Sequence, residues 1–133
     1  MTPLEKSNLV LAKILEKAME HGVSHWSLEF GDLGLDQDFA THFFPCVRWL
    51  EAEGLIRVEE CARSMGGLAE GSVENISLTS LGMAVLGTEI EIGGKKEPLS
   101  KAVTDVSEGR VDYHRIGDAI GGLIGGVIKS LGR

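Results

Sequence analysis

Two pairs of side chains have the residue types that nucleophilic catalysis or metal binding requires. His42 and Cys46 stand four residues apart with a proline between them, and His21 and His25 are also four apart. An imidazole beside a thiol can promote the thiolate, and two imidazoles can share a zinc ion. However, Gly22 is expected to end the helix that would align the second pair. We interpret Cys46 as a buried cysteine and His42 as a partly exposed histidine beside it.

Three carboxylates, Asp32, Asp36 and Asp38, crowd a short segment but lack the alternation and closing glutamate of a calcium loop. We expect them to cap the following helix. The chain has no G-x-S-x-G elbow and no P-loop. The sequence therefore predicts a protein that is not an enzyme, with no catalytic, cofactor-binding or metal-binding residues.

Basic side chains are few where DNA contacts would need them. Arg48, Arg57 and Arg63 are the candidate nucleic-acid residues, and glutamates surround them on both sides. The chain carries a net charge of -7 and has a pI near 5.0, and a field of that sign repels phosphate. DNA binding is therefore disfavoured. DNA binding would regain support if the fold gathered the scattered basic residues into one patch. These residues are Lys6, Lys13, Lys17, Arg48, Arg57 and Arg63.

Glycines recur at intervals of four near the C-terminus, at Gly117, Gly121 and Gly125, within an otherwise apolar stretch. In a helix this spacing produces a smooth groove that lets another helix approach closely. Glycine disfavours a helix, so such a helix needs a partner. Self-association and packing on the body both satisfy that need, and a flexible tail or contact with a membrane surface are the alternatives. The predicted self-association residues are Ile116, Gly117, Ile120, Gly121, Ile124, Gly125 and Ile128.

The first element is a helix over residues 3–21. Thr2 and Glu5 have the spacing of a capping box, and Pro3 occupies the first helical position. Gly22 provides the stop. Apolar residues at helical spacing between these ends predict a core-facing side.

A short strand over residues 26–30 and a turn over 31–34 follow. Apolar residues then recur at helical spacing, interrupted by Pro45, which would clash inside a continuous helix. Two helices, roughly 36–43 and 45–53, fit this pattern, and so does one kinked helix.

Gly54 ends this region, and strands are expected to begin at residue 55 and to return over 75–78, with a glycine-rich loop between them. Thr79 then caps a short helix that extends to residue 86. The stretch 88–92 alternates as an edge strand does, 93–96 is expected to be a turn or linker, and a helix is expected over about 98–106.

Two motifs carry a resemblance to a known superfamily. Trp-Leu-Glu-Ala-Glu-Gly-Leu-Ile-Arg spans residues 49–57, and Leu-Thr-Ser-Leu-Gly spans 78–82. They resemble the helix exit before the wing and the segment after it in winged helix-turn-helix proteins. The resemblance covers roughly residues 3–87 and implies a fold more than a function. Small proteins encoded by phages and prophages are similar in size and element order.

The charge divides unevenly along the chain. Residues up to Ile92 contain 15 acidic and six basic side chains, whereas the remainder contains five acidic and seven basic ones. The two cysteines make no disulfide framework, and no secretory signal or membrane span is seen. We expect a cytoplasmic protein with reduced thiols.

The predicted architecture is α+β. Residues 1–92 are expected to form a winged-helix-like body of three helices and a small antiparallel β-hairpin, and residues 93–133 a helical, glycine-rich appendage. The favoured function is a protein-interaction or regulatory module that has a protein partner and self-associates through the tail. The alternatives are a DNA-binding transcriptional regulator and a peripheral membrane protein.

Overall fold

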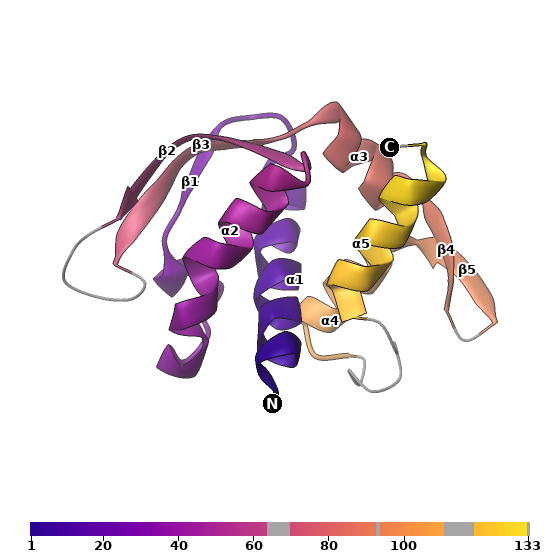
Figure 1. Ribbon diagram of the computed structural model, residues 1–133, viewed down its shortest axis with the longest axis horizontal. Coiled ribbons are helices and arrows are strands. Elements are labelled where there is room, and N and C mark those ends of the chain that lie inside the picture. The colour runs from indigo at the N-terminus through magenta and orange to yellow at the C-terminus, as the bar shows by residue number, and fades with distance from the viewer. Residues whose placement is uncertain (64–69, 93, 111–118, 133) are drawn as a thin grey trace.

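The computed structural model describes residues 1–63, 70–92, 94–110 and 119–132, and Figure 1 shows how their helices and strands are arranged. This part of the chain contains five α-helices, two 3₁₀ helices and two small antiparallel sheets. The predicted α+β class is confirmed. No helix among these residues has the length and apolar character that crossing a bilayer requires.

Helix α1, Pro3–His21, lies at the centre of the molecule and contacts α2, α4, α5 and the larger sheet (Figure 1). Its predicted ends are confirmed. The Thr2 hydroxyl accepts a hydrogen bond from the Glu5 N–H at 3.1 Å, and Gly22 follows the helix with a φ of 62°. Seven side chains of α1 are buried: Asn8, Val10, Leu11, Ala12, Ile14, Leu15 and Ala18.

Strand β1, Trp26–Leu28, is shorter than the predicted strand. The chain turns into a 3₁₀ helix, η1, over Phe30–Leu33 because the Asp32 carboxylate accepts a hydrogen bond from the Glu29 N–H at 2.8 Å. This bond satisfies a backbone donor that a strand would have paired with a neighbour.

The region around Pro45 contains two helices rather than one kinked helix. A 3₁₀ helix, η2, spans Gln37–His42, and α2 spans Phe43–Ala52. Pro45 is the third residue of α2. A backbone N–H at this position has no partner within the helix, so the N–H that proline lacks costs the helix little free energy. The first predicted helix is therefore 3₁₀, and the second begins two residues earlier than expected.

The larger sheet has the order β1-β3-β2, with all neighbours antiparallel. Strands β2, Ile56–Arg63, and β3, Gly71–Leu78, form the predicted hairpin. Both strands are longer than the predicted segments, because the pairing continues outward as far as Arg63 opposite Gly71.

Strand β3 changes the face that it turns toward the core at Asn75. Trp26 of β1 pairs with Ile76 and Leu28 pairs with Val73, so two steps along β1 correspond to three along β3. Asn75 has a φ of 51°, a backbone conformation that asparagine tolerates better than most residues. The resulting bulge lets Val73 and Ile76, three residues apart, both be fully buried.

Helix α3, Ser80–Gly87, begins as predicted at Thr79, whose hydroxyl accepts from the Gly82 N–H at 2.9 Å. The same hydroxyl donates to backbone carbonyls, including that of Leu55 at 3.1 Å. Gly82 is required here because a Cβ at this position would overlap the Leu55 carbonyl oxygen. Thus α3 packs directly on the backbone that leads into β2.

The predicted strand at residues 88–92 is present as β4, Glu89–Ile92, but it does not join the larger sheet. It pairs with β5, Lys95–Pro98, in a separate hairpin. The prediction of a turn or linker through residue 96 is therefore wrong for Lys95 and Lys96. Lys96 lies opposite Glu91, and such a cross-strand pair of opposite charges favours strand pairing.

The segments after β5 complete the same hydrophobic core. Helix α4, Leu99–Ser107, confirms the helix predicted from Pro98 onward, and α5 spans Ala119–Ser130. Leu99 and Val103 of α4 are fully buried and belong to the cluster that contains the buried residues of α1. The core therefore does not end at residue 92.

Candidate interaction surfaces

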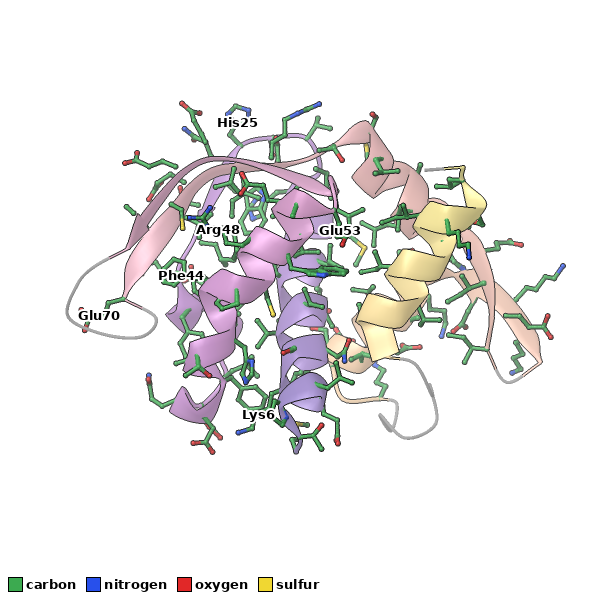
Figure 2. The ribbon with its side chains drawn as sticks, viewed as in Figure 1. Lys6, His25, Phe44, Arg48, Glu53 and Glu70 are labelled. Carbon is green, nitrogen blue, oxygen red and sulfur yellow. The ribbon has the colours of Figure 1, made fainter. Side chains whose placement is uncertain are left out.

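The outward side of α2 carries little charge. Its exposed residues are Pro45, Arg48 and Ala52, with Glu53 just after the helix, and Figure 2 shows Arg48 and Glu53 on α2 and at its end. The opposite side holds the helix in the core through Phe43, Phe44, Cys46, Val47 and Leu50. Glu51 of α2 is half-buried, so a partner that approaches α2 meets one guanidinium, that of Arg48, and the carboxylates of Glu51 and Glu53.

The β2–β3 hairpin is predominantly acidic. Arg57, Glu59 and Glu60 of β2 are exposed, and Glu60 lies directly opposite the half-exposed Glu74. Glu70 is exposed just before β3 (Figure 2). The side chain of Arg63 lies outside the described residues. The hairpin thus adds carboxylates to the side of the molecule where Arg57 is exposed.

Hydrogen bonds hold two of these carboxylates in place. Glu74 accepts from the hydroxyls of Ser27 and Ser72, and these bonds, that from Ser27 first, lower its pKa. The Asn75 side-chain amide donates to Glu59 at 2.9 Å. The fold therefore fixes these two carboxylates on the hairpin, and the lowered pKa keeps Glu74 charged at lower pH than an ordinary carboxyl group.

The lysines of the predicted basic patch lie along α1. Helical spacing places Lys6, Lys13 and Lys17 on one side of that helix, where Lys6 and Lys17 are about 16 Å apart along the axis. The Lys6 ammonium lies 5.9 Å from the Phe39 ring centroid, and Lys17 is 3.9 Å from a Glu20 carboxylate oxygen. Figure 2 shows Lys6 near the start of α1, well separated from Arg48.

Cys46 and His42 do not form a nucleophile and its base. Cys46 is buried, burial raises the pKa of its thiol to about 12, and its Sγ donates to the Ser7 carbonyl at 3.5 Å. His42 Nδ1 lies 3.1 Å from the Ser7 hydroxyl, which itself donates to the Pro3 carbonyl at 2.9 Å. These contacts join η2 and α2 to α1 and leave no activated thiolate at neutral pH.

The two histidines of the other candidate pair lie in different surroundings. The His21 ring stacks on Trp26 with a centroid distance of 5.0 Å, while His25 is exposed (Figure 2). Within the described ranges, no three histidine, cysteine, aspartate or glutamate side chains gather as a metal site would require.

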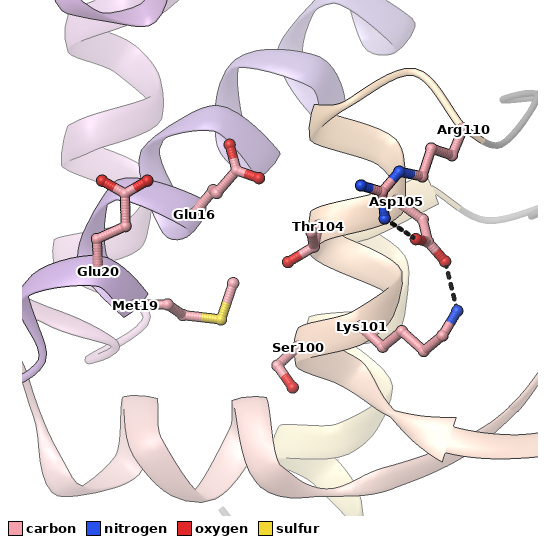
Figure 3. Close-up of a pocket in the computed structure, with 8 residues that line it drawn as sticks. All are labelled: Glu16, Met19, Glu20, Ser100, Lys101, Thr104, Asp105 and Arg110. Atoms are coloured by element: carbon pink, nitrogen blue, oxygen red, sulfur yellow. Dashed lines mark hydrogen bonds and ion pairs between the residues drawn. The ribbon is translucent and has the colours of Figure 1, made fainter.

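A cleft of about 530 Å³ lies between α1 and α4 (Figure 3). Asp105, which is mostly buried, accepts from the Lys101 ammonium at 2.9 Å and lies 3.7 Å from the Arg110 guanidinium. Lys101 is also 3.4 Å from Glu97, and the two carboxylates, Asp105 first, raise its pKa. The cleft is lined by Glu16, Met19, Glu20, Ser100, Lys101, Thr104, Asp105 and Arg110.

The cleft was not anticipated from the sequence. The spacing of four between Lys101 and Asp105 is the available signal, because it places the two on one side of α4, whereas Glu97 lies in β5. The charges on the α4 wall neutralise one another, and Glu16 on the α1 wall accepts from the Ser107 hydroxyl at 2.8 Å. The ion pairs link residues of β5, α4 and the segment after α4 to one another, whereas the Ser107–Glu16 hydrogen bond joins α4 to α1.

Helix α5 packs on its own body through three aliphatic anchors. Ile120 and Ile124 are fully buried and Val127 is 4% exposed, and the helix contacts α1, α3 and α4. Burial of three such side chains contributes about 5 to 9 kcal/mol. Its four glycines disfavour the helix by about 1 kcal/mol each relative to alanine. The helical state of α5 therefore depends on the groove that it occupies.

One polar contact fixes α5 on α1. Asn8 of α1 is 2% exposed, and its Oδ1 accepts from the Gly121 N–H at 2.9 Å while its Nδ2 donates to the Leu4 carbonyl at 2.7 Å. If the Asn8 amide lost either hydrogen-bond partner, a buried polar group would be left unsatisfied and the free energy of unfolding would fall. Asn8 was not predicted from the sequence, where its signal is a polar residue on the apolar side of a helix.

The predicted self-association residues divide into three groups. Ile120 and Ile124 are buried against the body, Gly121 faces α1, and Ile128 is half-buried. Gly125 is exposed, with open space around it. Ile116 and Gly117 lie outside the described residues. The structure thus shows the packing on the body that the sequence left open beside self-association.

The outward sides of α3 and α5 form a surface with almost no charge. Among the residues of the two helices, only Lys129 is charged. Met83 of α3 is 46% exposed, and Leu131, just after α5, is 44% exposed. Helices α3 and α5 contact one another (Figure 1). Such a charge-poor surface with exposed aliphatic side chains is typical of the centre of a protein interface.

No protein-family model, curated protein or solved structure matches this chain.

Proposed function

We propose that the N-terminal body is a winged helix that recognises a protein partner rather than DNA, and that the molecule self-associates through its C-terminal helix. Support for the fold comes from the element order: α1, β1, the 3₁₀ pair, α2, and the β2–β3 hairpin, in a sheet of order β1-β3-β2. In a winged helix, the helix before the hairpin and the hairpin itself form the contact surface.

The charge of that surface is the observation that carries the functional proposal. Arg48 and Arg57 are exposed on it, but Glu53, Glu59 and Glu60 are exposed there too. Affinity for DNA depends on neutralising several phosphates, and carboxylates at the same place oppose this. A positively charged protein surface would be attracted instead.

Binding of duplex DNA as a function of salt tests this half of the proposal. We expect no saturable fluorescence anisotropy change with labelled duplexes of mixed sequence at low salt. The double substitution Glu59→Lys and Glu60→Lys should create measurable, salt-sensitive binding if the hairpin is the contact surface. Tight binding by the unaltered chain that weakens steeply with salt would refute the proposal.

The DNA-binding regulator remains the second candidate because of one observation. Lys6, Lys13 and Lys17 share a side of α1, so a polyanion running along that helix would meet three cations. Replacing all three with glutamine separates the candidates, since only the DNA-binding account predicts a loss of DNA affinity.

Self-association is the second half of the proposal, and the charge-poor surface of α3 and α5 supports it. Two copies that each carry a net charge of -7 repel one another, but this surface brings almost no like charges together. Membrane association through the tail has less support, because the docked helix buries Ile120 and Ile124 away from any lipid.

Light scattering on the full chain over a range of concentrations tests self-association. We expect the mass of a dimer at high concentration, and the mass of a monomer for Met83→Glu combined with Leu131→Glu. As a matched control, Val23→Glu changes another exposed aliphatic residue, one that belongs to neither α3 nor α5. A monomer at every concentration would refute self-association.

A further inference from the structure

We propose that two copies of this chain exchange α5, so that each α5 occupies the groove of the other copy's α1, α3 and α4. This inference rests on the proposed self-association and specifies how it occurs. It is built from the described contacts of α5, which form a self-contained set.

First, α5 contacts the rest of the chain as a separate helical peptide bound to a protein groove would. Its buried anchors, Ile120, Ile124 and Val127, are spaced by four and three residues, which is the pattern of a helix docked in an apolar groove. None of these contacts depends on α5 and the groove belonging to one chain. A second copy offers the same groove, so exchange loses none of them.

Second, a side chain of α1 forms a hydrogen bond with the backbone of α5 at one residue. Asn8 accepts from the Gly121 N–H, and a Cβ at Gly121 would lie 3.5 Å from the Asn8 Oδ1 and 3.8 Å from the Leu11 Cδ1. These distances show that α5 approaches α1 closely at Gly121. The glycines at 125 and 126 have open space around them and are not needed for the fit.

The third step is that α5 is poorly suited to persist as a free helix. Four of its twelve residues are glycine, so its order depends on an occupied groove. At high protein concentration, an α5 that leaves its own groove can dock in the same groove of a second copy and make the same contacts there. The second copy is the occupant that we propose, because α5 is the helix that the structure shows to fit.

The fourth step is electrostatic. Exchange brings the two bodies together at the side where α3 and α5 lie, and in those two helices Lys129 is the only charged residue. The acidic hairpin belongs to other elements, β2 and β3. The nearest exposed carboxylates after α3 are Glu89 and Glu91 of β4, so two acidic bodies that meet through the outward sides of α3 and α5 bring few like charges together.

Thiol cross-linking between two variants of the full chain tests the exchange. Cys46→Ala and Cys61→Ser remove the native thiols, and then one variant carries Leu11→Cys and the other Gly121→Cys. Neither variant can form the α1–α5 link within one chain. After the two are mixed and oxidised, we expect a covalent heterodimer on a non-reducing gel, because Gly121 of one copy lies beside Leu11 of the other.

Gly126→Cys, mixed with the same Leu11→Cys variant, is the matched control, since residue 126 is exposed and has no neighbouring atoms within 4 Å of its Cβ position. We expect at least a tenfold lower yield of heterodimer from it. A dimer by light scattering with equal yields from both mixtures would overturn the exchange and leave self-association standing. A monomer with no covalent dimer would overturn both.

A labelled peptide of residues 119–130 provides a second test that needs no substitution in the protein. We expect a saturable rise in its fluorescence anisotropy on addition of the unaltered full chain, and no rise for the peptide with Ile120→Asp and Ile124→Asp. Equal signals from the two peptides would overturn the exchange even if the cysteine variants fail to fold.

Discussion

Helices α2 and α5 lie on either side of α1 (Figure 1), yet they are held there in different ways. Helix α2 contains no glycine and buries five side chains, two of them phenylalanines. Helix α5 contains four glycines and buries three aliphatic side chains. The contrast teaches that α2 is a fixed part of the core, whereas α5 is a helix that its groove keeps in order.

The glycines of the molecule show the same division. Gly82 of α3 cannot accept a side chain because the Leu55 carbonyl occupies that space, whereas Gly125 and Gly126 of α5 face open space. The glycine of α3 is thus a packing requirement, and the exposed glycines of α5 only weaken the helix. Three substitutions test this comparison, and a fourth tests the acidic hairpin.

Gly82→Ala should have the largest effect. The new methyl group would overlap a backbone oxygen, and such overpacking should lower the free energy of unfolding by about 3 kcal/mol. Urea denaturation followed by circular dichroism measures it. Gly87→Ala, in the same helix but with no atom near its Cβ position, is the control. Equal stabilities of the two variants would show that α3 does not pack on the Leu55 carbonyl.

Asn8→Leu should be next. It removes the acceptor of the Gly121 N–H, and an unsatisfied buried donor costs about 1 to 3 kcal/mol. We expect hydrogen exchange of the α5 amides to accelerate more than that of the α2 amides. Gln37→Leu, at an exposed amide of η2, should change neither. An unchanged α5 in the Asn8 variant would mean that the contact does not hold the helix.

Gly126→Ala should have a smaller effect, of opposite sign. Alanine favours a helix by about 1 kcal/mol over glycine, and nothing obstructs the new methyl group. The α5 amides should therefore exchange more slowly, while those of α2 keep their rates. A loss of stability would contradict the assignment of this side of α5 as open.

The smallest expected effect concerns the pKa of Glu74. Hydroxyls of Ser27 and Ser72 lower this pKa in the folded chain, so the contribution to stability is present above the unfolded pKa and is lost as pH falls through the folded value. Ser27→Ala should raise the pKa toward 4.5, the ordinary value. A carboxyl NMR titration measures the change, and an unaltered pKa would contradict the hydrogen bond.

Much of the fold was predictable because local signals carry it. Thr2, Pro3 and Gly22 mark the ends of α1 through capping chemistry, and Thr79 marks α3 in the same way. The hairpin follows from apolar strands that flank a glycine-rich loop. The bulge at Asn75 was not predictable, because it depends on how β1 pairs with β3.

The candidate surfaces were less predictable because they depend on contacts between distant segments. The glycine spacing indicated a groove on α5, but Asn8, the residue that contacts Gly121, is 113 positions away. Likewise, Lys95 and Lys96 were expected in a turn because their partners in β4 are not visible in a local pattern. Charge composition alone indicated the acidic hairpin.

Native-state hydrogen exchange on the unaltered full chain tests most directly whether α5 is held by its groove alone. Amides of α5, such as that of Ile124, should exchange at least tenfold faster than those of α2, such as that of Val47, because α5 can leave while the rest of the core persists. Equal protection of the two helices would contradict it, since α5 would then open only when the whole molecule unfolds.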